Sequence, residues 1–481
     1  MPQFVFLWTD IVLWAMLLLL VWYVWRVRVS ANLRATWDKV LRDPAALSAA
    51  IVLLLFAVVT MLDSVHFRRA LANAPDAAPG ATTFYAPSTE SVLDLALARQ
   101  IATRETAYSR PLAYKAFIKE PMERNGQPVR DFARLKFGGA QLADPDAQWA
   151  GDVTAKVLAG LAGGAVVAAL AVLLAAFLMR RSHAGTHGAL RDIAADRTHI
   201  PVRAALATFA VLCLVAGPMV TLAGHYHVLG TDRTGNDVLY QSLKSVRTAF
   251  VIGTLATMAT LPFAIVLGVL AGYLKGWVDE AIQYVYTTLT SVPNVLLIAA
   301  CVLMVQVYLD QHAEMFETGS ERSDLKIFLL CVILGLTGWA TLCRLIRGET
   351  LKLRELDFVQ AATAFGVSPV KIMVRHIVPN VMHLVLITTV LSFSELILYE
   401  AVLTYVGVGV DPSMNSFGGM INLARSQMSG DPVVWWSFVS AFVFMVTLVL
   451  AANLFADGVR DAFDPRARAF RRRLIRVHKA G

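Results

Sequence analysis

Charged residues are scarce in this sequence: Asp, Glu, Lys and Arg make up 16% of its 481 residues, whereas 57% are hydrophobic. A soluble domain carries roughly 25% charged residues, and a mean hydropathy of +0.58 lies far above that of such a domain. This composition excludes a soluble enzyme built around one large core. Cysteine is also scarce, and no Cys-x-x-Cys spacing occurs, which excludes a disulfide framework and a cysteine-based metal site. The four cysteines are expected to be buried free thiols: Cys213, Cys301, Cys331 and Cys343.

Three common catalytic signatures are missing. The sequence has no G-x-x-x-x-G-K-[ST] loop to hold ATP phosphates, no H-E-x-x-H zinc site and no G-x-S-x-G elbow. We therefore expect a chain that is not an enzyme, with no catalytic residue, resident metal or cofactor of its own.

What the sequence has instead is long apolar runs, each near the roughly 20 residues that cross about 30 Å of hydrocarbon as a helix. The runs are continuous, unlike the alternating segments of about ten residues in a membrane β-barrel. The predicted fold is an all-α, polytopic transmembrane bundle. We place nine spans at 4–25, 45–62, 155–178, 204–223, 249–273, 284–308, 327–346, 382–405 and 434–455.

The distribution of basic residues predicts the orientation. If the segment 26–44 is cytoplasmic, the inside segments carry 25 Lys and Arg, whereas the short outside segments carry six with Lys326 counted. Because cytoplasmic loops are enriched in Lys and Arg, we expect the N-terminus outside and the C-terminus in the cytoplasm. Loop 63–153 holds 11 basic residues, but loops of more than about 60 residues translocate regardless of charge.

The segment from 344 to 380, "RLIRGETLKLRELDFVQAATAFGVSPVKIMVRHIVPN", is predicted to form two short cytoplasmic helices. Asp357 is expected to cap the first helix and Gly366 to end it in a left-handed conformation. Ser368 and Pro369 start the second, which should stop before Pro379. The predicted apolar face of the first helix consists of Phe358, Ala361, Ala362 and Phe365.

This segment resembles the EAA signature of ABC importer permeases in its Ala361-Ala362 pair, in Gly366 and in Ile377-Val378-Pro379. In that family the loop docks into a groove of the cytoplasmic ATPase, so the resemblance makes 347–381 the coupling loop. The family usually has glutamate before the two alanines, and this chain has Gln360. The change removes a charge that could pair with the ATPase. An ordinary amphipathic linker at the membrane surface is the alternative.

Three further stretches narrow the resemblance to the dipeptide and oligopeptide permeases of the C-subunit type. They are "HVLGTDRTGNDVLYQSLKSVRTAF" from His227, "LTYVGVGVDPSMNSFGGMI" from Leu403 and "NLFADGVRDAFDPR" from Asn453. The resemblance covers residues 200–468 and implies a type I permease core of six spans. Residues 1–199 would be an extension with three spans and the extracytoplasmic loop 63–153, and 469–481 a basic cytoplasmic tail.

The resemblance implies a complex in the bacterial inner membrane. Its other members would be a homologous second permease, two cytoplasmic ATPases that bind ATP and Mg²⁺, and a substrate-binding protein outside. Peptides would cross by alternating access. Related permeases pass nickel chelates or glutathione, so these substrates stay open.

Two glutamates within the eighth span are candidates for the translocation path. Glu395 and Glu400 lie about 140° apart around a helix, so they cannot both face the same surroundings. Glu395, the deeper of the two, is the better candidate for lining the path. The alternative is a glutamate hydrogen-bonded into a helix interface.

The loop before the fifth span contains two histidines and two aspartates, which are common metal ligands. Its glycines and threonine indicate turns instead, with aspartate holding the backbone. We predict an extracytoplasmic loop at the mouth of the path, meeting the binding protein or the peptide, with these residues: His227, Gly230, Thr231, Asp232, Gly235 and Asp237.

Several features outside these motifs have simpler interpretations. The basic tail suits anionic lipids of the inner leaflet, with nucleic-acid binding a weak alternative. Gly160 and Gly164 have the G-x-x-x-G spacing of close helix packing, against the core or the second permease. Two rival functions are an ion-coupled transporter that uses Glu395 and Glu400, and a membrane sensor. The first needs inverted repeats and the second a cytoplasmic output domain, and neither is found.

Overall fold

The computed structural model describes residues 3–71, 85–124, 127–181, 185–316, 318–430 and 432–463. The predicted basic tail 469–481 and part of loop 63–153 lie outside these ranges. Within them nine helices are long and apolar enough to cross a membrane, which confirms the predicted number and order of spans. They are α1 (Trp8–Val29), α3 (Pro44–Asp63), α6 (Pro145–Met179), α8 (Val202–Ala223), α9 (Val238–Leu274), α11 (Asn294–Gln311), α12 (Gly319–Arg354), α15 (Val378–Tyr405, continuous with the turns from Pro369) and α17 (Trp436–Phe463).

Shorter elements connect these spans. The helices are α2 (Ala31–Leu41), α4 (Val92–Ala96), α5 (Ala98–Ala102), α7 (Gly185–Ala194), α10 (Gly276–Ser291), α13 (Asp357–Ala364), α14 (Pro369–Ile372) and α16 (Phe417–Met428), with a 3-10 turn at Ala313–Met315 and a π-turn at Met373–Ile377. The strands are β1 (Gln3–Val5), β2 (His66–Arg68), β3 (Glu90–Ser91), β4 (Lys115–Arg124) and β5 (Gln127–Arg134).

The chain divides into two compact units. The first contains Met1–Val5, Leu41–Thr248 and Asn415–Ala451, and the second Phe6–Val40, Ala249–Met414 and Ala452–Gly481. These units cut across the boundary at 199/200 that the sequence motifs suggest. Helix α1, which precedes that boundary, belongs to the same unit as α12 and packs against it.

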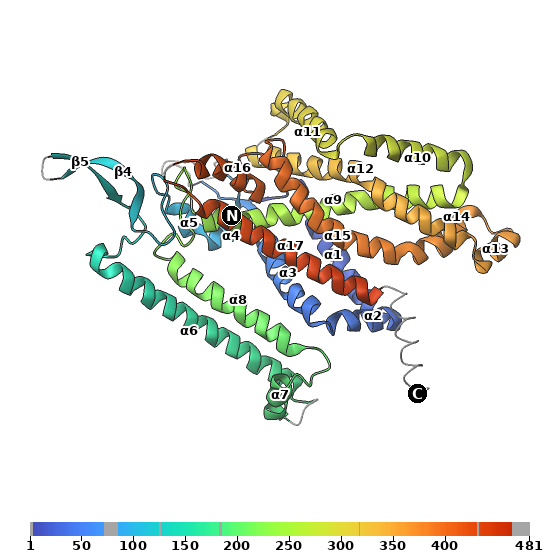
Figure 1. Ribbon diagram of the computed structural model, residues 1–481, viewed down its shortest axis with the longest axis horizontal. Helices are drawn as coiled ribbons and strands as arrows, with labels where there is room; N and C mark the ends of the chain where they lie inside the picture. Colours follow the sequence, from blue (N-terminus) through green and yellow to red (C-terminus); the bar gives the residue numbers. More distant parts are fainter. Residues whose placement is uncertain are drawn as a thin grey trace, which may run out of the picture. The chain divides into compact units, whose positions relative to one another are not determined.

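In the first unit, α6 and α8 lie side by side along most of their length (Figure 1). Glycine allows this approach, because a Cβ added to Gly217 of α8 would stand 2.2 Å from the carbonyl oxygen of Gly160. At Gly164 an added Cβ would stand 2.4 Å from the Cys213 carbonyl oxygen. The G-x-x-x-G pair thus packs on α8 of the same chain.

Loop 63–153, expected to be irregular, contributes strands to two small antiparallel sheets. Strands β2 and β3 of the loop form one with β1 from the start of the chain, and β4 pairs with β5 in a two-stranded ribbon. An Asn-Gly dipeptide at 125–126 separates β4 from β5 in the sequence. That dipeptide is a strong hairpin signal, so the ribbon was open to prediction.

The second unit corrects the predicted span 284–308. The helix ends at Ser291, and a new one begins at Asn294 after Val292 and Pro293. Proline disfavours helical conformation in the residue before it, and Val292 is extended, with φ −89° and ψ 135°. The span predicted from hydropathy combined the end of α10 with most of α11. The helix long and apolar enough to cross the membrane is α11, from Asn294 to Gln311.

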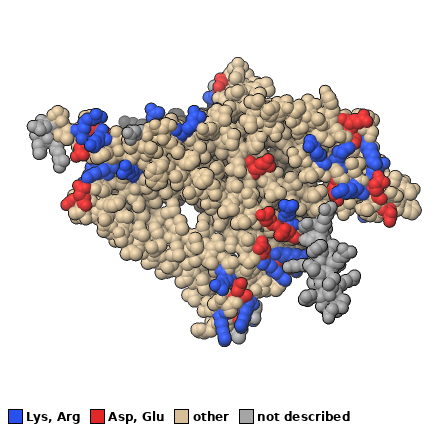
Figure 2. All heavy atoms as spheres, viewed as in Figure 1, with Lys and Arg blue, Asp and Glu red and all other residues tan. Residues whose placement is uncertain are grey.

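Contacts inside the second unit join segments that the sequence places on one side of the membrane. Near the predicted outer ends, the Thr9 backbone N–H donates to Asp324 Oδ2 over 3.0 Å, and Lys326 Nζ lies 2.7 Å from Asp411 Oδ2. At the predicted inner ends, the rings of Trp37 and Phe463 are 5.8 Å apart. These contacts support the predicted alternation of the spans. On the face shown in Figure 2, charged side chains gather mostly near helix ends and loops.

The four cysteines are free thiols, as predicted. Cys331 and Cys343 are buried, whereas Cys213 and Cys301 are partly exposed. The expectation of burial is therefore wrong for two of them.

Candidate functional site

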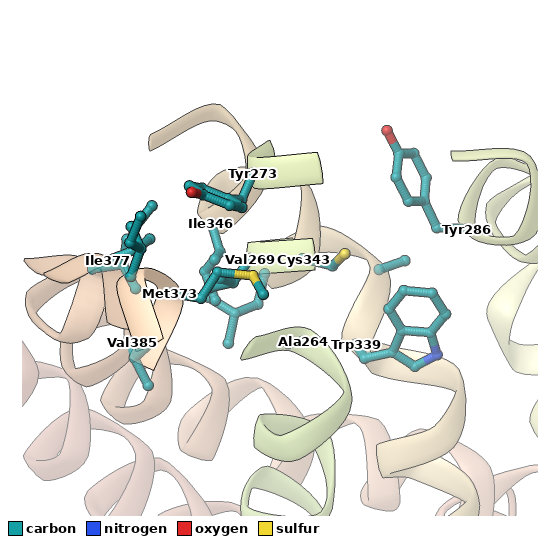
Figure 3. Packing of buried hydrophobic residues seen from close by; sticks show 14 of the residues in the cluster. Ala264, Val269, Tyr273, Tyr286, Trp339, Cys343, Ile346, Met373, Ile377 and Val385 are labelled. Atoms are coloured by element: carbon teal, nitrogen blue, oxygen red, sulfur yellow. The ribbon is translucent and has the colours of Figure 1, made fainter. Parts of the chain in front are cut away.

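The predicted coupling loop lies between α12 and α15 and consists of α13, α14 and the π-turn (Figure 1). Its base belongs to a buried apolar cluster that also contains residues of α9 and α12. Figure 3 shows how the side chains from these helices converge. From the loop the cluster takes Val359, Ile372, Met373 and Ile377, and from the two spans Val269, Tyr273, Cys343 and Ile346.

The opposite surface of the loop is apolar and exposed. Phe365 is 87% exposed and Phe358 46%. Val370 and Val374 are 65% and 64% exposed. Two exposed phenylalanines on one loop indicate a surface that binds another protein, because protein-binding surfaces use aromatic side chains as anchors.

The predicted apolar face of α13 is therefore only partly right. Val359 is the buried residue of this helix, and Ala362 packs partly against the cluster. Phe358, Ala361 and Phe365 point away from it and are exposed. Apolar side chains cover a broad side of α13, opposite Asp357, Gln360 and Thr363, so the 3.6-residue period could not tell which part of that side packs against the chain and which part is free.

The sequence predicts the C-terminal end of α13 correctly and its N-terminal end incorrectly. Gly366 has φ +75°, which confirms the predicted left-handed end. Asp357 does not cap the helix, because Leu356 is the N-cap and Asp357 is the first helical residue. Gln360, in the place of the family glutamate, is exposed and its Nε2 donates to the Glu355 carbonyl oxygen over 3.2 Å.

Pro379 does not end the second helix, contrary to the prediction. The chain passes from α14 through the π-turn into α15, with Pro379 in the first turn of α15. Proline lacks an N–H and its ring crowds the preceding turn. The wider π-turn supplies the needed room, and the Val378 N–H donates to the Met373 carbonyl oxygen. The loop is thus joined to α15 by a nearly continuous helix.

Polar contacts brace the cytoplasmic ends of the same helices. Arg347 of α12 donates to both oxygens of Asp279 on α10, with Nε–Oδ1 at 2.6 Å and Nη2–Oδ2 at 2.7 Å. Arg354 Nη1 donates to the Tyr273 carbonyl oxygen over 2.8 Å. These bonds tie α12 to α9 and α10 directly beside the loop.

The predicted outer loop is built around His227, which lies between two carboxylates. Its Nδ1 is 2.8 Å from Asp237 Oδ2 and its Nε2 is 3.6 Å from Glu105 Oε1. Burial would lower the pKa of His227, but the hydrogen bond to Asp237 and the nearby Glu105 carboxylate raise it to about 9. Burial would raise the pKa of Glu105, but His227 and the backbone N–H groups of residues 136–138 lower it to about 2. His227 is therefore a buried cation at neutral pH.

The turn chemistry predicted for this loop is confirmed. Gly230 and Gly235 have φ values of +76° and +79°. Asp232 Oδ1 accepts from the backbone N–H groups of Thr234 and Asn236 over 2.8 and 2.9 Å. These bonds fix the backbone of the turn, as expected for aspartate in loops.

Five of the six predicted residues are buried within the chain and Asp232 is partly exposed, and contact of this loop with a binding protein or a peptide stays a prediction. His227, Thr231 and Asp237 are at most 3% exposed. The Thr231 hydroxyl donates to the Ala107 carbonyl oxygen over 2.9 Å. Trp436 Nε1 donates to the Thr231 carbonyl oxygen, also over 2.9 Å. The loop is a packed junction between the 63–153 insertion and the start of α17.

The two intramembrane glutamates have different surroundings, as their angular separation predicts. Glu400 is 1% exposed and its Oε1 accepts a hydrogen bond of 2.7 Å from the Thr404 hydroxyl. That hydroxyl also accepts from the Val410 N–H over 3.1 Å. Glu400 therefore orders the turn after α15. Glu395 is exposed, and its place in the path stays a prediction.

Sequence reasoning missed Glu105 and the Arg347–Asp279 pair. Glu105 is 122 residues from His227, and Asp279 is 68 from Arg347. No local period links partners so far apart.

Comparison with known proteins places the chain. Residues 264–469 match the family model described as binding-protein-dependent transport system inner membrane component. The oligopeptide transport system permease protein OppC of Mycobacterium tuberculosis is 32% identical over 249 residues, which is 52% of this chain and 79% of that protein. The glutathione transport system permease protein GsiD of Pectobacterium atrosepticum is 31% identical over 243 residues, 50% of this chain and 74% of that protein.

A dipeptide transport system permease protein, DppC of Lactococcus lactis, is 29% identical over 241 residues, 50% of this chain and 64% of that protein. With nine apolar helices in the described residues, these matches lead to one conclusion. The chain is a multi-pass inner-membrane protein that belongs to the family of binding-protein-dependent transport system inner membrane components.

Proposed function

We propose that this chain is the permease subunit of an ABC importer for peptides. The observation that carries the proposal is the coupling loop, whose base packs on α9 and α12 and which presents exposed Phe358 and Phe365. Relatives named as oligopeptide and dipeptide permeases supply the substrate class. Glutathione is the second candidate, because a glutathione permease matches equally well.

The proposed complex contains a second permease, two ATPases that bind ATP and Mg²⁺, and an extracytoplasmic binding protein. The ATPase groove would receive Phe358 and Phe365 on each cycle. Movement of the loop would pass to α15 through the π-turn and to α9 and α12 through the buried cluster. Rocking of these helices gives alternating access.

The proposed orientation has the N-terminus outside and the C-terminus in the cytoplasm. It rests on the 25 to six distribution of basic residues over the inside and outside segments. The coupling loop then faces the ATPases. Modification of single cysteines placed at residues 6 and 358 by a membrane-impermeant reagent tests this orientation in whole cells.

The test of the proposed function is purification of the tagged chain in mild detergent, with mass spectrometry of its companions and ATP-dependent peptide uptake after reconstitution. The expected companions are a second permease and two P-loop ATPases. Phe365→Ser should lower the amount of ATPase recovered with the chain at least tenfold, because an anchor in a docking groove contributes about 2 kcal/mol or more. The amount of the second permease should not change.

Phe6→Ser is the matched control, because Phe6 is 79% exposed but distant from the coupling loop in sequence. It should retain all companions. Ala362 is a poorer site for the test, because its side chain packs inside the chain. Purification of the chain alone, with uptake driven by an ion gradient, would instead establish the secondary transporter.

A further inference from the structure

Glu395 is an acidic residue placed deep in a membrane span. From residue 395 to the end of α15 at residue 405 is about 15 Å at 1.5 Å per residue, half of a hydrocarbon core of about 30 Å. Its side chain is exposed on the surface of the chain. The carboxylate therefore sits near the middle of the membrane without cover from its own chain.

The exposed side of α15 is a stripe with one charge in it. Residues at spacings of four and three share this face, and each is exposed: Leu391, Glu395, Leu398, Val402 and Tyr405. The other side of the helix packs inside its unit, with Ile397 and Leu403 fully buried. The ring of Phe393 packs against Gly253 of α9, where an added Cβ would stand 2.8 Å from it.

Two other carboxylates in membrane-crossing helices have hydrogen-bond partners within the chain. Glu400 accepts from Thr404, and Asp324 accepts from the Thr9 backbone. In the part of the chain that the structure describes, Glu395 has neither a hydrogen bond nor an ion pair. A carboxylate facing lipid costs about 2.5 kcal/mol or more, so its partner must come from outside this chain.

A water-lined path satisfies Glu395 at little cost, and the charge then selects what binds there. The stripe offers hydrocarbon contacts one turn to either side, from Leu391 and Leu398, and one acceptor for a cation between them. We propose that Glu395 is a binding site for the ammonium group of the peptide in transit. A single exposed charge gives weak binding, which suits a site that must release its ligand.

This inference rests on the proposed function, and its first test measures the local charge at Leu398. Leu398→Cys in the complete, reconstituted complex is treated with a cationic ethylammonium and an anionic ethylsulfonate methanethiosulfonate reagent. With Glu395 present, the ratio of the cationic to the anionic reaction rate should be about tenfold higher than the ratio for a small free thiol in solution. In the Leu398→Cys, Glu395→Gln protein the ratio should fall toward that of the free thiol.

The parent chain, which keeps partly exposed Cys213 and Cys301, gives the background rate. Val402→Cys, one turn further on, serves if Leu398→Cys does not assemble. Trialanine with ATP should protect the cysteine. Loss of reaction with both reagents would place the stripe against lipid or the second permease and overturn the inference.

Transport supplies the second readout. Glu395→Gln should raise the trialanine concentration for half-maximal uptake about tenfold, with Glu395→Asp between it and the parent. Glu314→Gln, which removes an exposed carboxylate outside the stripe, should change it less than twofold. Unchanged uptake in Glu395→Gln would overturn the inference. Failure of the parent complex to import any peptide with ATP would instead refute the proposed function.

Discussion

Arg347 on α12 holds Asp279 on α10 through two hydrogen bonds of 2.6 and 2.7 Å, beside the base of the coupling loop. Both side chains are less than a quarter exposed. Arg347→Met should lower the free energy of unfolding by about 2 kcal/mol, because it leaves a partly buried carboxylate unpaired. Thermal unfolding of the purified protein measures the change.

Lys352→Met is the control for Arg347→Met. Lys352 is 67% exposed and pairs with Glu349 at the surface, so its loss should change stability by less than about 0.5 kcal/mol. Arg347→Lys should fall between the two, since lysine cannot form the two parallel bonds. Equal stability of Arg347→Met and Lys352→Met would show that the Asp279 pair contributes nothing.

The outer junction should lose stability as the solution becomes alkaline. The pKa of His227 is raised from 6.5 to about 9 in the folded protein, so its contribution is complete below pH 6.5 and is lost as pH rises through 9. A shift of this size corresponds to a contribution of the order of 3 kcal/mol. Hydrogen exchange of residues 103–112 should therefore accelerate between pH 6.5 and 9 beyond its intrinsic rise.

His227→Gln should remove that excess acceleration, whereas His187→Gln, at an exposed position on α7, should keep it. At the acid end the sign reverses for Glu105. Its pKa is lowered from 4.5 to about 2, so its contribution is present above pH 4.5 and is lost as pH falls through 2. A junction equally stable at pH 6.5 and 9 would contradict the charged state of His227.

The nine spans were predictable because long apolar runs are the strongest signal a sequence gives. The left-handed turns at Gly230, Gly235 and Gly366 were predictable because glycine tolerates positive φ. The break at Pro293 was signalled by proline but hidden within a continuous apolar run.

The orientation of α13 was beyond the sequence for a physical reason. A surface that binds a partner is itself apolar, so Phe358 and Phe365 look like core residues, and only packing against α9 and α12 identifies Val359 as the seated one. Long-range polar pairs were equally hidden, since His227 and Glu105 meet only after the insertion has folded.

Two glycines with similar backbone angles should respond differently to alanine. Gly235 and Gly366 both have positive φ, which costs an alanine about 1–2 kcal/mol. At Gly235 an added Cβ would also stand 1.9 Å from the Glu105 carbonyl oxygen, whereas at Gly366 nothing lies within 4 Å. Gly235→Ala should therefore destabilise the protein by about 3 kcal/mol and Gly366→Ala by about 1. Thermal unfolding of the two variants compares them, and equal losses would refute the close contact at Gly235.

The helix pair formed by α6 and α8 can be opened by one side chain. An added Cβ at Gly160 would lie 2.5 Å from Pro218 Cα of α8, whereas at Gly163 on the same helix nothing lies within 4 Å. Because close approach of backbones drives this kind of packing, Gly160→Leu should separate α6 from α8 and Gly163→Leu should not. A disulfide between cysteines introduced at Lys156 and Thr221, which meet through a 2.9 Å hydrogen bond, should form readily in the parent and with Gly163→Leu. With Gly160→Leu it should form at least tenfold more slowly, and equal rates would mean that the glycine contact does not hold the pair together.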